Sequence, residues 1–206
     1  MSDPRITIVY YSSTGTIHAL AAAVAEGAEK AGAETRLRRV PELAPDEVVQ
    51  SVSAWHEHLE STRDVPVATH DDLEWADGFL FGTPTRFGNV SAQLRQFIDT
   101  LSPAWQAGDL TDKAASGFTA AISPHGGHES TLISLYQTFM HWGAIIVSPG
   151  YIDDGASTHV GNPYGTSVVA GENSPSEGEL EAARFQGRRV AEVARALSAL
   201  RQPAAA

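Results

Sequence analysis

The chain has 206 residues, enough for one α/β domain with a complete hydrophobic core. Its net charge of −11 disfavours nucleic acid and anionic membranes as partners, because both attract basic surfaces. The lack of cysteine excludes disulfides, thiolate metal ligands and a cysteine nucleophile. No apolar run approaches the ~20 residues of a membrane span, and residues 1–5 contain no apolar signal segment, so we expect a cytoplasmic protein.

The first predicted unit is a strand, a loop and a helix. Residues 6–10 are apolar and largely β-branched, as in a buried strand. The helix that follows has its apolar positions on one face, at Ile17, Leu20, Ala21, Val24 and Ala28. Between them, residues 11–17 bring hydroxyl side chains and Gly15 to a helix N-terminus. Such hydroxyls and free N–H groups predict an anion site.

A monophosphate suits this loop best. The loop contains no lysine or arginine, and it matches neither the triphosphate pattern G-x-x-x-x-G-K-[ST] nor the dinucleotide pattern G-x-G-x-x-G. Taken alone, the same residues also fit an ordinary helix N-cap with spare serines.

The next part of the chain predicts a strand near a sheet edge and a long connection. Residues 34–40 read as a second strand, whose polarity favours an edge position. Residues 41–72 are mixed and polar, and we expect short helices at 47–52 and 55–59 within them.

Three further strands alternate with helices. Residues 78–82 are wholly apolar, as in a central parallel strand, and a helix follows at 91–101. A strand at 115–121, a helix at 130–142 and a strand at 144–147 complete this part.

The end of the chain predicts a loop-rich passage and a terminal helix. Residues 149–171 are loop-like, and Ser176 with Glu179 forms a capping box for a helix reaching about Leu200. The β–α alternation as a whole predicts a doubly wound parallel sheet. In such a sheet, the loops after the first, third and fourth strands meet at the carboxyl ends of the strands, where ligands bind.

The loop after the third strand carries the most informative motif. Residues 82–89 read G-T-P-T-R-F-G-N, with a proline that stiffens the turn and an aromatic suited to a planar ring. Together with Q-x-R-x-F-x-D at 93–99, this segment resembles the WrbA-type NAD(P)H:quinone oxidoreductases of the flavodoxin-like superfamily. The likeness continues at residues 126–132, 141–143, 162–165 and 183–187, so it covers nearly the whole chain.

The resemblance implies a flavodoxin-like α/β fold with a five-stranded parallel sheet of order 2-1-3-4-5 and helices on both faces. It implies one domain over residues 1–206, with insertions at about 41–72 and 149–171. It also implies non-covalent FMN, NADH or NADPH as the hydride donor, a quinone as the acceptor, and self-association into a homotetramer. Flavin N5 then takes the hydride, so no side chain is assigned a catalytic role and no metal is expected.

The resemblance also implies which residues contact the cofactor. The phosphate site comprises Ser12, Ser13, Thr14, Gly15, Thr16 and Ile17. The isoalloxazine ring lies along Pro84, Thr85, Arg86 and Phe87. The pyrimidine edge of the ring meets Ala120, Ala121, Ile122, Gly126 and Gly127. His141 matches a position that contacts the flavin, and Trp105 matches an aromatic wall on the substrate side.

Two departures from the family pattern bear on this site. Thr14 stands where many relatives have an aromatic, which affects the fit of the hydride donor. Residues 120–123 read A-A-I-S instead of S-T-G-T, so side-chain hydroxyls are lost and a lower FMN affinity is expected.

Two groups of histidines suggest other sites, but neither is expected to bind a metal. His125, His128 and Glu129 resemble part of a metal site, but the group lacks a third well-spaced ligand and lies on the predicted flavin loop. His56 and His58 lie in a polar connection, where we expect both to be solvated.

Three functions remain open from the sequence. The first is a two-electron NAD(P)H:quinone oxidoreductase. The second is a one-electron carrier that docks on protein partners, for which the net charge of −11 would be suitable. The third is a flavin-binding module without turnover. The long connections and the WrbA-like motifs favour the enzyme.

Overall fold

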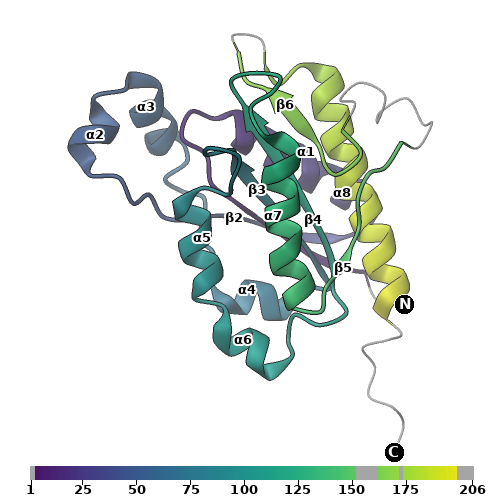
Figure 1. Cartoon of the computed structure of the whole chain (residues 1–206). Coiled ribbons are helices and arrows are strands. Elements are labelled where there is room, and N and C mark those ends of the chain that lie inside the picture. The colour runs from purple at the N-terminus through teal and green to yellow at the C-terminus, as the bar shows by residue number, and fades with distance from the viewer. Residues whose placement is uncertain (1–2, 152–161, 172–173, 199–206) are drawn as a thin grey trace, which may run out of the picture.

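A parallel sheet with helices on both faces forms the centre of the molecule (Figure 1), in a computed structural model that describes residues 3–151, 162–171 and 174–198. Its five main strands are β1 (Arg5–Tyr10), β2 (Glu34–Arg39), β3 (Gly78–Pro84), β4 (Ala114–Ala121) and β5 (Ile145–Ile146). Their order is β2-β1-β3-β4-β5, and every pair is parallel. This confirms the predicted order and the edge position of the second strand.

A sixth strand is present that the sequence did not predict. β6 (Ser167–Val169) lies in the passage expected to be loop-rich, and it pairs with β4 at residues 119–121. β5 pairs with β4 at Ala114 and Ala115. β4 therefore pairs with β5 near its amino end and with β6 near its carboxyl end. The buried Val168 explains why this short segment joins the sheet. β6 thereby extends the sheet at its carboxyl end.

One face of the sheet is covered by α1 (Thr16–Lys30) and α8 (Glu177–Leu197), which lie side by side (Figure 1). The helices approach closely because glycines face the opposing backbone. A Cβ at Gly27 would lie 1.9 Å from the Arg184 carbonyl oxygen, and one at Gly187 would lie 2.0 Å from that of Val24. The predicted capping box of α8 is present, with Ser176 and Glu179 each bonding the other's backbone N–H. Larger residues at either glycine would force the helices apart.

The other face is covered by α5 (Ala92–Asp99) and α7 (His128–His141), with α6 (Ser102–Ala107) after α5. Their apolar side chains join a core of packed aromatic rings at Phe79, Phe81, Phe97, Phe139 and Trp142. We predicted one helix over residues 91–101, but α5 ends at Asp99 and α6 starts three residues later with a proline in its first turn.

The long connection after β2 contains the two short helices that we predicted, α2 (Asp46–Gln50) and α3 (Ser53–Ser61). It ends in α4 (His70–Trp75), which the sequence analysis missed. A capping box between Thr69 and Asp72 starts α4. Within the described residues, no helix is long and apolar enough to cross a membrane.

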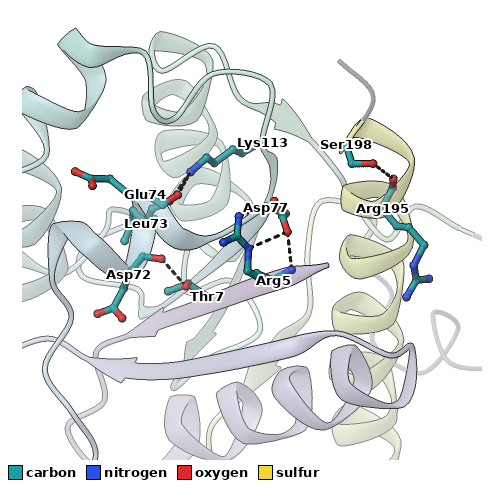
Figure 2. A network of polar contacts seen from close by, with 9 residues as sticks. All are labelled: Arg5, Thr7, Asp72, Leu73, Glu74, Asp77, Lys113, Arg195 and Ser198. Atoms are coloured by element: carbon teal, nitrogen blue, oxygen red, sulfur yellow. Dashed lines mark hydrogen bonds and ion pairs between the residues drawn. The ribbon is translucent and has the colours of Figure 1, made fainter. Parts of the chain in front are cut away.

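The amino end of the sheet is held by polar contacts between segments far apart in the sequence (Figure 2). Thr7 Oγ1 on β1 donates to the Asp72 carbonyl oxygen at 2.7 Å, and the Arg5 N–H donates to the Asp77 carboxylate at 2.8 Å. The buried Lys113 Nζ donates to the carbonyl oxygens at the end of α4, those of Leu73 and Glu74. Hydrogen bonds of this kind fix α4 against the starts of β1 and β4.

Candidate functional site

The loop between β1 and α1 is shaped to receive an anion. Ser12 is buried, and its Oγ accepts a hydrogen bond from the Gly15 N–H at 3.0 Å, which closes the loop. Gly15 precedes α1 with φ of 102°, a conformation that side chains rarely adopt. The first turn of a helix leaves N–H groups without intrahelical partners, and here they face the loop. Hydroxyls and N–H groups are therefore available to one small anion.

The loop after β3 forms a tight turn that places an aromatic side chain in the open. Arg86 and Asn89 exchange backbone hydrogen bonds of 2.8 and 3.0 Å, and Phe87 within the turn has φ of 53°. Its side chain is fully exposed. Arg86 Nη2 lies 3.4 Å from Ser13 Oγ, so its guanidinium connects this loop to the first one.

The loop after β4 packs directly on the turn after β3. Gly127 and Gly88 lie so close that a Cβ at Gly127 would be 2.7 Å from the Gly88 Cα. The Thr131 hydroxyl donates to Thr85 Oγ1 at 2.7 Å, and the Thr85 N–H donates to the Ala120 carbonyl oxygen at 2.9 Å. These contacts hold the second and third loops as one unit.

The three loops enclose a cavity of about 580 Å³, within the range of ligand sites in proteins. One end is lined by hydroxyl groups and the other by apolar side chains. The lining residues are Ser12, Ser13, Thr14, Thr16, Ile17, Pro84, Thr85, Arg86, Phe87, Ala120, Ala121, Ile122, Gly126 and Ala170. Every predicted cofactor residue lines this cavity except Gly15, Gly127 and His141. Ala170, which follows β6, was missed because β6 itself was not predicted.

A sequence model of the NADPH-dependent FMN reductase family matches residues 4–158, about three quarters of the chain. The chain belongs to this family. Its relatives include an NAD(P)H dehydrogenase (quinone) of Deinococcus radiodurans, 46% identical over 92% of this chain and 94% of the relative. One of the same name from Geobacter sulfurreducens is 46% identical over 94% of this chain and 99% of the relative.

Solved structures of other proteins have the same fold as this chain. A WrbA-like flavodoxin from Agrobacterium tumefaciens is 31% identical, with a TM-score of 0.68 over 94% of this chain and 98% of that one. An archaeal flavodoxin is 15% identical, with a TM-score of 0.62 over 93% of this chain and 99% of that one, which shows the fold alone. The resemblance to WrbA-type proteins and the flavodoxin-like fold are thus confirmed.

The residues at the cavity fit FMN. The hydroxyl-lined end suits a phosphate, and Pro84, Phe87 and Ile122 offer apolar surface for a planar ring. Arg86 is the one cationic side chain among the lining residues, so most of the negative charge of a phosphate would meet uncharged donors. The carbonyl oxygens of Ala120 and Ala121 already accept hydrogen bonds from Thr85 and Ala170. These two carbonyl oxygens therefore already form hydrogen bonds within the protein.

His141 and Trp105 lie away from the cavity in this FMN reductase family member. His141 ends α7, whose fourteen residues span about 20 Å from the third loop. Trp105 Nε1 donates to the His141 carbonyl oxygen at 3.0 Å, and both line a separate surface depression of about 410 Å³. The structure therefore does not bring these two predicted residues to the cavity of the same chain.

A hydrogen-bonded cluster that the sequence did not predict ties the connection after β2 to the first loop. Glu42 accepts from the Tyr11 hydroxyl at 2.7 Å, from Gln93 Nε2 at 2.7 Å and from Trp55 Nε1 at 3.0 Å. Burial opposes ionisation of Glu42, but hydrogen bonds from Ala44, Gln93 and Tyr11 outweigh it and lower the pKa of the carboxyl. Burial, followed by the bond to Glu42, raises the pKa of Tyr11. The charged Glu42 thus fixes Tyr11, which precedes Ser12.

One of the two histidines that we expected to be solvated is buried. His56 is exposed as predicted, but the prediction for His58 is wrong, because α3 turns this side chain inward and buries it. His128 is also buried, and its Nε2 lies 3.0 Å from the Val168 carbonyl oxygen. In the described part of the chain, no group of three histidine or carboxylate side chains is arranged to hold a metal.

Proposed function

We propose that this chain is an FMN-dependent NAD(P)H:quinone oxidoreductase that reduces quinones by two electrons in alternating half-reactions. The observation that carries the proposal is the cavity at the carboxyl end of the sheet, with hydroxyl groups at one end and apolar surface at the other. The relatives named NAD(P)H dehydrogenase (quinone) support it, because they are 42–46% identical over nearly the whole chain.

The first loop would hold the cofactor phosphate and the other two loops would hold the ring. Ser12, Thr16 and the N–H groups at the start of α1 would bind the phosphate oxygens. Residues 84–87 and 120–127 would line the isoalloxazine ring, with Gly15 and Gly127 supporting the loop conformations. Bound FMN would supply the hydride chemistry, with NADH or NADPH as donor.

The chain's own residues would orient the reactants and stabilise charge. The Arg86 guanidinium, beside the first loop, would stabilise negative charge that develops on the reduced ring. Phe87 and Ile122 are almost fully exposed at the cavity, and their apolar surface suits a planar quinone. Donor and quinone would use this surface in turn.

We also propose that the working unit is a homo-oligomer, a tetramer by resemblance. The exposed side chains of Phe87, Trp105 and Ile122 leave apolar surface at the cavity and on α6, and such surface is commonly covered in an assembly. His141 and Trp105 would then reach a flavin from another copy of the chain. The net charge of −11 supports small molecules over nucleic acid or anionic membranes as partners, and we propose the cytoplasm as the location.

An anaerobic titration tests the proposed function. FMN-loaded protein should lose its flavin absorbance on addition of one equivalent of NADH or NADPH and regain it on addition of one equivalent of benzoquinone. Flavin that neither nicotinamide reduces would overturn the proposal in favour of a carrier or a binding module. Light scattering over a dilution series, with quinone reduction followed in parallel, tests the assembly. A fully active monomer at every concentration would contradict it.

A further inference from the structure

Two histidines lie directly behind the first loop, outside the cavity. His18 is the third residue of α1, and His58 comes from α3 in the long connection after β2. Their ring centroids are 5.5 Å apart. His58 Nδ1 lies under Gly15, 3.6 Å from where a Cβ of that residue would be. His58 therefore packs against the loop at Gly15, and neither ring is among the residues that line the cavity.

The groups that face this pair come from four elements. On β1, the Tyr10 hydroxyl lies 2.7 Å from His18 Nδ1, and on β2 the charge of Arg39 acts on Tyr10. The two imidazoles face each other from α1 and α3. No hydrogen bond or ion pair within the described residues joins a carboxylate to either ring. Within the part of the chain that the structure describes, no bonded carboxylate therefore offsets an imidazolium charge on either ring before an anion binds.

Without a ligand, both rings are neutral at pH 7. Burial lowers the pKa of His18, and the nearby start of α1 adds to this effect because its dipole disfavours a positive charge. Burial, and then the neighbouring His18, lowers the pKa of His58 to about 4. Burial also raises the pKa of Tyr10 to about 12, so this hydroxyl stays neutral. The pair is thus an uncharged group that can take a proton from solvent when a nearby anion stabilises the imidazolium.

We propose that the His18–His58 pair takes up a proton when a phosphate monoester binds the first loop, and that it selects flavins that carry a phosphate. This inference rests on the proposed function, since FMN is the ligand concerned. The pair is a positioning element, because neither ring lines the cavity.

The physical reason is the shortage of positive charge at the loop. A phosphate monoester carries nearly two negative charges at pH 7, and Arg86 is the one cation among the lining residues. A dianion bound by the loop stabilises an imidazolium beside Gly15, since opposite charges favour the charged form. This role also gives a purpose to the insertion at 41–72, because α3 delivers His58 to the loop.

Calorimetry with FMN and riboflavin tests the proposal. Each flavin is titrated into the apoprotein at pH 7.5 in two buffers of different ionisation enthalpy. The phosphate of FMN is already a dianion at this pH, because its second pKa is about 6. We expect uptake of up to one proton per FMN and none per riboflavin. The FMN affinity should fall by up to tenfold per pH unit above pH 7.5, whereas the riboflavin affinity should stay constant.

The matched variants are His18→Asn, His58→Asn and, as control, His56→Asn. Asparagine keeps a polar group near the Nδ1 position but does not titrate. Wild-type proton uptake should persist in the His56→Asn variant, whose side chain is exposed on the same helix, and disappear in the double variant. Circular dichroism verifies folding.

FMN binding without proton uptake, or with equal uptake in the double variant, would overturn the inference while leaving the proposed function intact. An apoprotein that binds neither FMN nor riboflavin would overturn both.

Discussion

The two ends of the sheet use opposite kinds of polar group. At the amino end and along the edge strand β2, charged side chains pair within the protein. Asp72 accepts from Arg38 at 2.9 Å and from Arg36 at 3.1 Å, and Arg5 meets Asp77. At the carboxyl end, one end of the cavity is lined by hydroxyl groups beside the start of α1, and Arg86 is the one cation among the described lining residues. Both ends belong to the same strands, so the difference lies in the loops.

This contrast separates stability from binding. Paired charges in a partly buried setting hold α4 and β2 against the sheet, and removing one partner leaves the other without compensation. Around the cavity, no ion pair within the described residues involves a lining side chain, and free N–H groups at the start of α1 can serve a ligand. Mutations at the amino end should therefore change the free energy of unfolding, and mutations at the carboxyl end should change affinity for FMN.

The largest expected effect is at the amino end, from Asp72→Asn. The amide cannot satisfy both guanidinium groups and also the capping box at Thr69, so unfolding free energy should fall by ~3 kcal/mol. FMN affinity should change less than about twofold, since Asp72 is remote from the cavity. Urea denaturation and fluorescence titration measure the two quantities. Asp71→Asn, on the exposed side of the same helix turn, is the control and should change stability by less than ~0.5 kcal/mol.

The next effect is at the carboxyl end, from Thr16→Glu. The added carboxylate occupies the position of the phosphate, so FMN affinity should fall at least ~100-fold. Stability should stay equal or rise by a few tenths of a kcal/mol, because an acid in the first turn of α1 favours the helix. Thr16→Gln, similar in size but uncharged, should lose much less affinity. Equal losses in the two variants would refute the electrostatic explanation.

The elements that form these two ends were largely predictable, because they follow from local patterns. Alternation of apolar strands and helices predicted the parallel sheet, the resemblance to WrbA-type proteins implied its strand order, and the motifs at 11–17 and 82–89 indicated two of the three loops. Burial of His58 was not predictable, since it depends on how α3 packs against α1. The place of Trp105 and His141 was not predicted either, although the expected helix at 130–142 has the observed length, because the resemblance assigned both residues to the flavin site without regard to which copy of the chain holds the flavin. Such features arise from tertiary packing, which local patterns do not encode.

The two ends should also lose their contributions to the free energy of unfolding in different pH ranges. The pKa of His58 is lowered to about 4, so the folded apoprotein binds fewer protons than the unfolded chain below pH ~6.5. Stability from this group is complete above pH ~6.5 and falls by ~2–3 kcal/mol as the pH drops towards 4. The pKa of Asp72 is also lowered, so its contribution is lost only below the usual range of an aspartate, under pH ~4.

Denaturation of the apoprotein across this pH range measures the difference. His58→Asn should reduce the slope of the curve between pH ~6.5 and 4, where the lowered pKa of His18 still contributes, and leave the fall below pH ~4 in place. A wild-type curve that is already flat above pH 4 would show that His58 is protonated in the folded protein.

The smallest effect is expected at the mouth of the cavity, from Phe87→Asn. The Phe87 side chain is fully exposed and its φ of 53° is one that asparagine tolerates, so stability should change by less than ~0.5 kcal/mol. Loss of contact with a flavin ring should lower affinity for FMN about three- to tenfold. Fluorescence titration measures this loss. Asn89→Ser, in the same turn, serves as the control, because Asn89 is not among the residues that line the cavity.

The central claim is that the loop at residues 11–17 binds the phosphate of FMN, and the preference of the wild-type protein for FMN over riboflavin tests it most directly. The two ligands differ only in the phosphate. We predict that FMN binds at least ~100-fold more tightly at pH 7, because the hydroxyl groups and the start of α1 act on the phosphate alone. Equal affinities for FMN and riboflavin would contradict the account.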